Sequence, residues 1–149
     1  MHPILDKAKV KTTMRWLEPY PDIPSMIALG IAGKMHYGYD FAPCMECKNQ
    51  CIFIIAPVSG KVIQADTYWF DDDKHPFGNL IKIESNSSDR GNIHYLAHLE
   101  RIFVQEGHNV KKGQVIALMG NTGCSSAKHT HYGVKNPNLE WIDPKIYLT

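Results

Sequence analysis

The sequence predicts an all-β domain whose strands pair antiparallel. Its apolar stretches are short and separated by turns rich in Gly and Pro, and no long stretch carries the 3.6-residue period of an amphipathic helix. At 149 residues, with 44% hydrophobic and 21% charged residues, the chain has the size and composition of one soluble globular domain. We therefore expect one antiparallel sheet domain with short connections.

Charge and hydropathy argue against two classes of partner. The formal net charge of +1 gives no electrostatic basis for binding nucleic acid. No apolar run approaches the roughly 18 residues of a membrane-spanning helix. Residues 1–7 lack the basic start and apolar core of a secretory signal. We expect a monomer that inserts into no membrane and shows no signal peptide.

The first 33 residues differ from the rest of the chain. Four prolines interrupt them, so long regular elements are not expected; these are Pro3, Pro19, Pro21 and Pro24. A short strand is predicted at 10–16 and a helical turn at 24–31. We interpret residues 1–33 as an arm that packs on a domain formed by residues 34–149.

The domain begins with a β-prone aromatic segment, residues 35–41, that carries His36 and Asp40. On a straight strand these two side chains share a face, but their Cα atoms lie ~13 Å apart. Joint binding of one metal ion needs a bend, which Gly38 permits. For this segment alone, a metal-ligand pair and two polar residues of a half-buried strand are equally acceptable interpretations.

The middle of the chain supplies the remaining strands. Residues 51–57 and 61–65 flank a turn at 58–60 and predict a hairpin. Further strands are predicted at 80–84, 93–99 and 115–119. His94 and His98 have the same parity in the fourth of these five strands, so both are expected on one face. Their separation along a strand lets only one of them reach a given site.

Near the C-terminus, His129 and His131 stand one residue apart in a β-prone run. Residues i and i+2 of a strand point to the same face, so both imidazoles are expected to point into the same space. A final helical turn is predicted at 143–148, with Pro144 at its start. With His36, Asp40 and His98, these histidines suit a metal with three protein ligands and an open position, plus two groups that move protons.

In their order along the chain, the motifs resemble those of the M23 family of zinc metallopeptidases, which contains lysostaphin and the LytM-type cell-wall enzymes. The resemblance covers residues from about 34 to the end. It rests on the H-x-x-x-D motif of His36 and Asp40, residues 56–62 and 95–99, residues 110–114 and 120–123, the H-x-H motif of His129 and His131, and residues 142–148.

The resemblance implies a sandwich-like antiparallel sheet domain with a groove that holds zinc. The ligands would be His36, Asp40 and His131, while His98 and His129 would move a proton and steady the tetrahedral intermediate. The substrate would be a stem or cross-bridge peptide of bacterial peptidoglycan. The chain would act on the cell wall as an antibacterial hydrolase, outside the cytoplasm or delivered by phage as an endolysin.

One departure from the family concerns the oxyanion. Many relatives place a Tyr before a Gly-Asn pair, and its hydroxyl can hydrogen-bond the oxyanion. Here Phe77 precedes Gly78 and Asn79. We expect that the role is absent or is filled by Tyr68 or Tyr95.

The four cysteines are a second departure, since Cys44, Cys47 and Cys51 form a C-x2-C-x3-C cluster and Cys124 precedes His129 by five residues. They could form two disulfides, hold a second, structural zinc, or remain free thiols. We favour a role in fixing the loops beside the groove, with Cys124 tied to the cluster.

Two other functions compete with the enzyme. One is a non-catalytic M23-like module that binds the cell wall or regulates a partner. All five motif positions are intact here, which argues against this alternative. The other is a β-sheet carrier of the biotinyl or lipoyl kind, which shares short strands and Gly turns. A carrier presents a modifiable Lys at a hairpin tip and has no use for the His/Asp set, so we rank it lowest.

Overall fold

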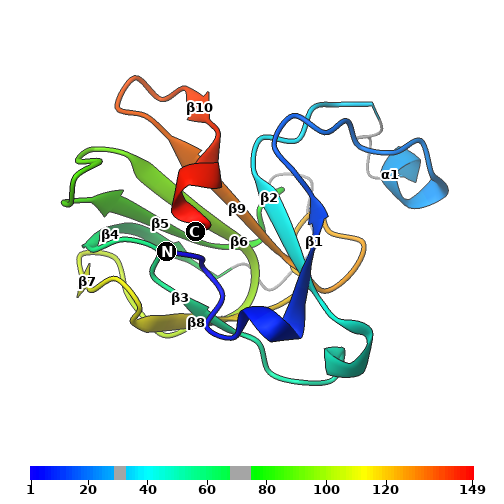
Figure 1. Cartoon of the computed structure of the whole chain (residues 1–149), viewed down its shortest axis with the longest axis horizontal. Helices are drawn as coiled ribbons and strands as arrows, with labels where there is room; N and C mark the ends of the chain where they lie inside the picture. Colours follow the sequence, from blue (N-terminus) through cyan, green and yellow to red (C-terminus); the bar gives the residue numbers. More distant parts are fainter. Residues whose placement is uncertain (29–32, 68–74) are drawn as a thin grey trace.

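One antiparallel sheet of ten strands forms the fold in the computed structural model, which describes residues 1–28, 33–67 and 75–149. Its main path runs β1-β2-β9-β6-β5-β4-β7, while β10 pairs with β9, and β8 pairs with both β6 and β3 (Figure 1). This confirms the predicted all-β class. The strands are β1 (Val10–Met14), β2 (Tyr39–Pro43), β3 (Phe53–Ile55), β4 (Gly60–Asp66), β5 (Asn79–Ser85), β6 (Ile93–Ile102), β7 (Asn109–Val110), β8 (Val115–Met119), β9 (Thr130–Lys135) and β10 (Trp141–Ile142).

Helical structure in the described residues is confined to short turns. These are η1 (Lys7–Lys9), α1 (Pro24–Ala28), η2 (Met45–Cys47) and η3 (Pro144–Tyr147). The predicted turn at 24–31 is present up to Ala28, and the rest of that prediction lies outside the described residues. The turn predicted near Pro144 is confirmed, with the Asp143 side chain accepting a hydrogen bond from the backbone of Lys145. No described helix has the length and apolarity needed to cross a membrane.

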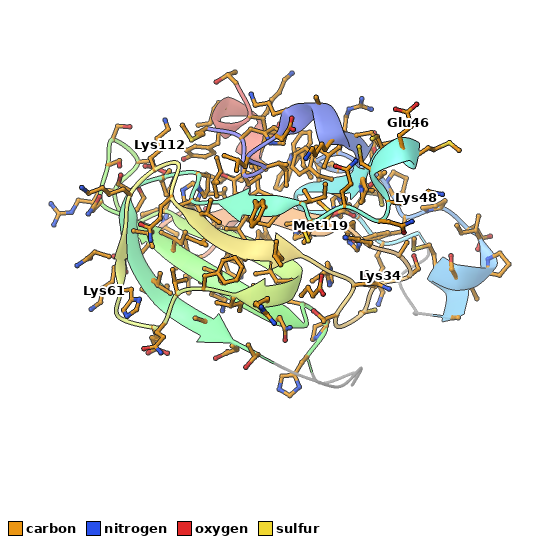
Figure 2. The ribbon with its side chains drawn as sticks, turned by 90° about the horizontal axis from the view of Figure 1, so that it is seen from below. Lys34, Glu46, Lys48, Lys61, Lys112 and Met119 are labelled. Carbon is orange, nitrogen blue, oxygen red and sulfur yellow. The ribbon has the colours of Figure 1, made fainter. Side chains whose placement is uncertain are left out.

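The two faces of the central strands differ in what they carry. On β9, Tyr132 and Val134 are fully buried in the main core together with Phe41 and Leu96. The alternate residues of the same strands point away from that core, as Asp40 pairs with His131 across β2 and β9. We call this second face the site face. In Figure 2, the buried Met119 of β8 lies inside the molecule, while the exposed Lys61, Lys112 and Glu46 lie at its edges.

The predicted hairpin of residues 51–57 and 61–65 is wrong. Both strands exist, but β3 pairs with β8, and β4 pairs with β5 and β7. The turn between them therefore joins two strands that pair with different partners. Gly60 shows why the second strand is held elsewhere: a Cβ there would meet the Glu84 backbone oxygen at 2.1 Å, so β4 lies tightly against β5.

The described part of the arm at the start of the chain contacts the domain at several points. β1 pairs with β2, Ile4 forms a bridge with Ile54, and the backbone of Leu17 donates to the carbonyl of His36. β1 is therefore an edge strand of the sheet. The division of the chain at residue 33 stays a prediction.

A buried polar network fixes the end of the chain behind the sheet. His94 is fully buried, with Nδ1 2.9 Å from the Tyr132 hydroxyl and Nε2 2.9 Å from Oδ2 of Asp89. The Tyr147 hydroxyl of η3 donates to the same carboxylate oxygen at 2.8 Å. Burial lowers the pKa of His94, so the neutral ring donates from Nε2 and accepts from Tyr132.

Candidate metal centre

Three neighbouring segments bring the polar residues of the site face together. Asp40 of β2 lies opposite His131 of β9, and His131 in turn lies opposite Ala97 of β6. His36 precedes β2, and the chain bends at Gly38 before the strand begins. A Cβ at Gly38 would lie 2.5 Å from the Tyr132 backbone oxygen and 2.6 Å from the His131 ring. The bend that folds His36 back therefore requires glycine.

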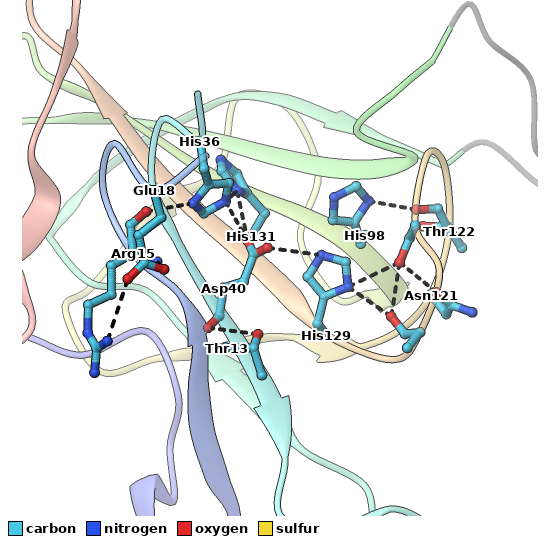
Figure 3. A network of polar contacts seen from close by, with 12 residues as sticks. Thr13, Arg15, Glu18, His36, Asp40, His98, Asn121, Thr122, His129 and His131 are labelled. Carbon is cyan, nitrogen blue, oxygen red and sulfur yellow. Dashed lines mark hydrogen bonds and ion pairs between the residues drawn. The ribbon is translucent and has the colours of Figure 1, made fainter. Parts of the chain in front are cut away.

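Three donor atoms converge at the centre of this arrangement (Figure 3). His36 Nε2 lies 2.9 Å from both Asp40 Oδ1 and His131 Nδ1, and the last two are 3.0 Å apart. All three residues are buried. Among the described residues, they are the only group of three or more His, Cys, Asp or Glu side chains whose donor atoms gather within 4.8 Å.

The hydrogen bonds around His36 test whether the group fits a cation. Its Nδ1 lies 3.1 Å from the Arg15 carbonyl oxygen, which can only accept, so Nδ1 carries the proton. In the neutral ring, Nε2 then presents a lone pair toward the lone pairs of the Asp40 carboxylate. Two lone pairs that face each other repel, and only a shared proton or a metal ion between the two atoms removes that repulsion. A carbonyl that orients a ligating histidine in this way is common around metal ions, and His₂Asp fits zinc.

Electrostatics hold Asp40 in its charged form. Burial alone would raise the pKa of Asp40, but hydrogen bonds from His131 and His36 hold it far below its ordinary value. Burial opposes protonation of His36, yet the hydrogen bond and charge of Asp40 outweigh it and raise the pKa of His36. Burial lowers the pKa of His131 despite the same carboxylate. One charged oxygen donor and two histidine nitrogens therefore face one another.

His98 reaches the site through an irregularity of β6. Between Leu96 and Leu99 that strand advances three residues, while its partner β5 advances two from Ile81 to Asn79. The extra residue forms a bulge, and His98 adopts φ 60°, a conformation that non-glycine residues rarely take. The prediction that His94 and His98 share a face is therefore wrong. The expectation that only one of them reaches the site is confirmed.

His98 and His129 present the same ring nitrogen to the site. His98 Nδ1 lies 2.7 Å from the Thr122 carbonyl oxygen and His129 Nδ1 lies 2.8 Å from that of Ala127. Each Nδ1 therefore donates, which leaves Nε2 as the free position. His129 Nε2 lies 3.7 Å from Asp40 Oδ2. The ring centres of His98 and His129 are 4.6 Å apart. Burial and the neighbouring His129 and His131 lower the pKa of His98 to about 3, so its ring is neutral.

A pocket of about 460 Å³ opens on the His129 side of these residues. Its lining joins the site to the arm, and includes Tyr20, Met26, Asp40, His98, Cys124 and His129. The Tyr20 ring packs edge-on against His36 with their centres 5.3 Å apart. Burial and the charge of Asp40 raise the pKa of Tyr20 well above its ordinary value, so its hydroxyl stays protonated. Sequence reasoning missed Tyr20, because nothing local signals that the arm returns to the site.

Of the two tyrosines singled out from the sequence, the one that the structure describes, Tyr95, does not line this pocket. Tyr68 lies outside the described residues. Tyr95 is buried on the site face between Phe77 and Trp141, whose ring centres lie 6.0 and 4.9 Å from its own. Its role at the oxyanion stays a prediction.

The four cysteines, all in the described part of the chain, form no disulfide. The Cys44 and Cys47 thiols hydrogen-bond each other, which raises the pKa of Cys47, while Cys124 lines the pocket beside His98 and His129. No cysteine belongs to a metal-binding group among the described residues. The structure therefore does not support a second, structural zinc.

Comparison with known sequences shows that this chain is similar to peptidases. The model of peptidase family M23 matches residues 34–144. Lysostaphin of Staphylococcus simulans is 36% identical over 114 residues, which are 76% of this chain and 19% of lysostaphin. The peptidoglycan DD-endopeptidase ShyB of Vibrio cholerae is 47% identical over 100 residues, 66% of this chain and 20% of ShyB. The chain thus spans about a fifth of the length of these relatives.

Solved structures agree with the sequence comparison. The catalytic domain of lysostaphin from Staphylococcus simulans superposes with a TM-score of 0.71 and 31% identity, over 95% of this chain and 93% of that domain. The five polar residues of the site all lie within residues 34–144, which match the family model.

Proposed function

The chain belongs to peptidase family M23, and on this premise we propose that it is a zinc-dependent endopeptidase that hydrolyses peptide bonds of bacterial peptidoglycan. The observation that carries the proposal is the convergence of His36 Nε2, Asp40 Oδ1 and His131 Nδ1 within 3.0 Å of one another. These residues would hold the ion. Zinc bound there would lower the pKa of a bound water and polarise the scissile carbonyl.

His98 and His129 are placed to handle protons beside that centre. Both keep Nδ1 bonded to a backbone carbonyl and present Nε2 on the pocket side of Asp40. A neutral imidazole with a free Nε2 accepts a proton, and once protonated it donates a hydrogen bond or returns the proton. One ring would take the proton from water at Nε2 and then return that proton to the leaving amine. The other ring, with a proton from solvent on its Nε2, would stabilise the tetrahedral intermediate by a hydrogen bond.

Tyr20 is our candidate for the hydroxyl that Phe77 lacks. Its ring contacts His36, it lines the pocket, and its raised pKa keeps the proton on the oxygen. A protonated phenol in a partly dry pocket donates a hydrogen bond to developing negative charge. The N-terminal arm would then complete the active site as well as cover the sheet.

The setting of this activity is part of the proposal. Similarity to lysostaphin and to a peptidoglycan endopeptidase supports action on the cell wall. An antibacterial, phage-type lysin, delivery by phage and a monomeric state stay predictions, as does a role of the cysteines in fixing the loops near the pocket. The non-catalytic module stays the alternative function.

The decisive experiment compares zinc content and bond cleavage in two variants. His131→Ala should lose the zinc and the activity, whereas His129→Ala should keep about one zinc per chain and lose cleavage of purified peptidoglycan. Mass spectrometry of the released fragments identifies the bond that is cut. Equal zinc loss in both variants would show that the division of roles is wrong. A wild-type chain that binds zinc but releases no fragment from any peptidoglycan would support the non-catalytic module instead.

A further inference from the structure

A second group of side chains adjoins the metal centre on the site face, on the His131 side. We call it the aromatic–lysine patch, made of Phe77, Lys82, Tyr95, Lys135 and Trp141. Strand register brings it together: Tyr95 of β6 lies between Lys82 of β5 and Gly133 of β9, and Gly133 stands midway between His131 and Lys135. None of the five residues lines the pocket described above. The patch is therefore a separate surface.

Ring contacts connect the patch to the metal centre. Phe77 has its ring centre 6.0 Å from that of His131 and 6.0 Å from that of Tyr95, and Tyr95 lies 4.9 Å from Trp141. The backbone supports this packing, since the His98 amide donates to the Phe77 carbonyl at 2.8 Å. An aromatic floor thus runs continuously from a metal ligand to the far end of the patch.

Two ammonium groups stand over that floor. Lys135 Nζ lies 4.7 Å from the centre of the Trp141 ring and 5.8 Å from that of Tyr95. Lys82 Nζ lies 4.8 Å from the centre of the Tyr95 ring. Both lysines are half-buried. Cation–π contact orients such a group but replaces only part of a full counter-charge. Two fixed positive charges therefore share one aromatic surface.

The two ammonium groups of the patch have no acidic partner in the part of the chain that the structure describes. Within the described residues, no carboxylate forms an ion pair with Lys82 or Lys135. Burial and the charge of Lys135 lower the pKa of Lys82, against a smaller opposite effect of Asp66, whose side chain accepts a hydrogen bond from Gln64. An external anion between the two ammonium groups would relieve their mutual repulsion.

We propose that the aromatic–lysine patch is a substrate subsite that binds a carboxylate of the peptide being cleaved. This inference rests on the proposed endopeptidase function and deepens it. Lys135 lies four residues beyond His131 on β9, a span of ~13 Å for an extended chain. The bound carboxylate therefore lies a few residues from the cleaved bond. Peptidoglycan stem peptides carry free carboxylates, whereas oligoglycine cross-bridges carry none, so the patch favours stems.

The test combines changes in the enzyme with changes in the substrate. The variants Lys82→Gln and Lys135→Gln are compared with wild type on purified sacculi, either native or with their carboxylates converted to primary amides. Each variant should cleave native sacculi ~10- to 100-fold more slowly in kcat/KM, the usual effect of losing one charged hydrogen bond. Amidated sacculi should slow the wild-type enzyme by a similar factor and slow the variants no further. Variants that keep the wild-type ratio between native and amidated sacculi overturn the proposal.

Matched controls separate charge from folding. Lys112→Gln removes an exposed lysine from the turn between β7 and β8, outside the patch, and should leave both rates unchanged. Lys135→Arg keeps the positive charge and should restore most of the preference for native sacculi. Similar urea melts of all variants exclude unfolding as the cause of a lost rate.

A binding measurement keeps this inference distinct from the proposed activity. The His129→Ala chain should bind a synthetic stem pentapeptide more tightly than the same peptide with its carboxylates as amides, by calorimetry. Adding Lys135→Gln should abolish that difference. Loss of the difference supports the subsite even if the wild-type chain cleaves nothing. Equal affinity for the two peptides before the lysine is changed refutes it.

Discussion

His94 and His98 stand four residues apart on β6 and point to opposite faces of the sheet. His94 is buried in the core face against Tyr132 and Asp89, while His98 lies on the site face 4.6 Å from the His129 ring, measured between ring centres. Regular alternation would place both on one side. The bulge at His98, with φ 60°, inserts the one residue that reverses its direction. The site therefore depends on a locally strained backbone.

That strain predicts different stabilities for two inactive variants. His98→Gly and His98→Ala should both lose ~10²–10⁴-fold in turnover, because each removes the same proton-handling group. The glycine variant should be the more stable of the two by about 1 kcal/mol, since only glycine adopts this φ without steric cost. Urea unfolding measures the difference, and zinc content should stay at one per chain in both. An alanine variant as stable as the glycine variant would show that the backbone there is unstrained.

Gly38→Ala should disturb the metal centre without touching a ligand. The added Cβ would collide with the Tyr132 carbonyl and the His131 ring, and the backbone carbonyl has no room to move. We expect zinc affinity to fall ~10- to 100-fold, as when groups that orient ligands are changed. Competition with a chelator measures it. The control Gly107→Ala strains a left-handed position in open space and should leave zinc affinity unchanged, so equal affinities in both variants would contradict the steric argument.

Tyr20→Phe should reduce kcat ~10²–10³-fold while KM and zinc content stay near wild type, because one hydrogen bond to the oxyanion is lost. Steady-state kinetics on a soluble peptidoglycan fragment measure the change. Tyr39→Phe is the matched control, since Tyr39 precedes Asp40 but packs in the main core on the opposite face. If both variants turn over at the wild-type rate, Tyr20 has no part in the reaction.

The His94 network predicts a pH dependence of stability. Burial lowers the pKa of His94 below its ordinary 6.5, so below that pH the unfolded chain binds a proton that the folded chain does not. The free energy of unfolding should therefore fall as the pH falls from 6.5 to 5, by at most ~1.4 kcal/mol per pH unit for this one group. The pKa of Asp89 is lowered as well, but its contribution is lost only below 3.8, outside this window.

Replacing His94 checks the assignment. In the zinc-loaded chain, His94→Gln should flatten the dependence between pH 6.5 and 5 by up to that amount, measured as urea unfolding free energies at several pH values. It should also lower stability at pH 7, because two buried hydrogen bonds are weakened. An unchanged slope would assign the pH dependence to other histidines, such as His2, whose pKa burial lowers to about 4.

The sequence alone gave the fold class, most strands and the segments that form the site. Alternation and turn residues are local properties of the chain, so they predict strands well but not their partners. This is why β3 and β4 were both expected and their pairing as a hairpin was wrong: the partner of a strand is selected by packing between distant segments. The cysteine cluster was equally undecidable, because disulfide and metal sites depend on distances that spacing does not fix.

For the site, the residue types and short spacings were determined by the sequence itself. The i, i+2 parity of His129 and His131 and the bend at Gly38 follow from local backbone geometry, and both are present in the structure. Tertiary structure decided the rest: the bulge that turns His98 to the site, the Arg15 and Thr122 carbonyls that orient His36 and His98, the return of Tyr20, and the two lysines of the aromatic–lysine patch. Each of these depends on contacts between segments far apart in the chain. These contacts form only when the sheet assembles, so no local pattern in the sequence predicts them.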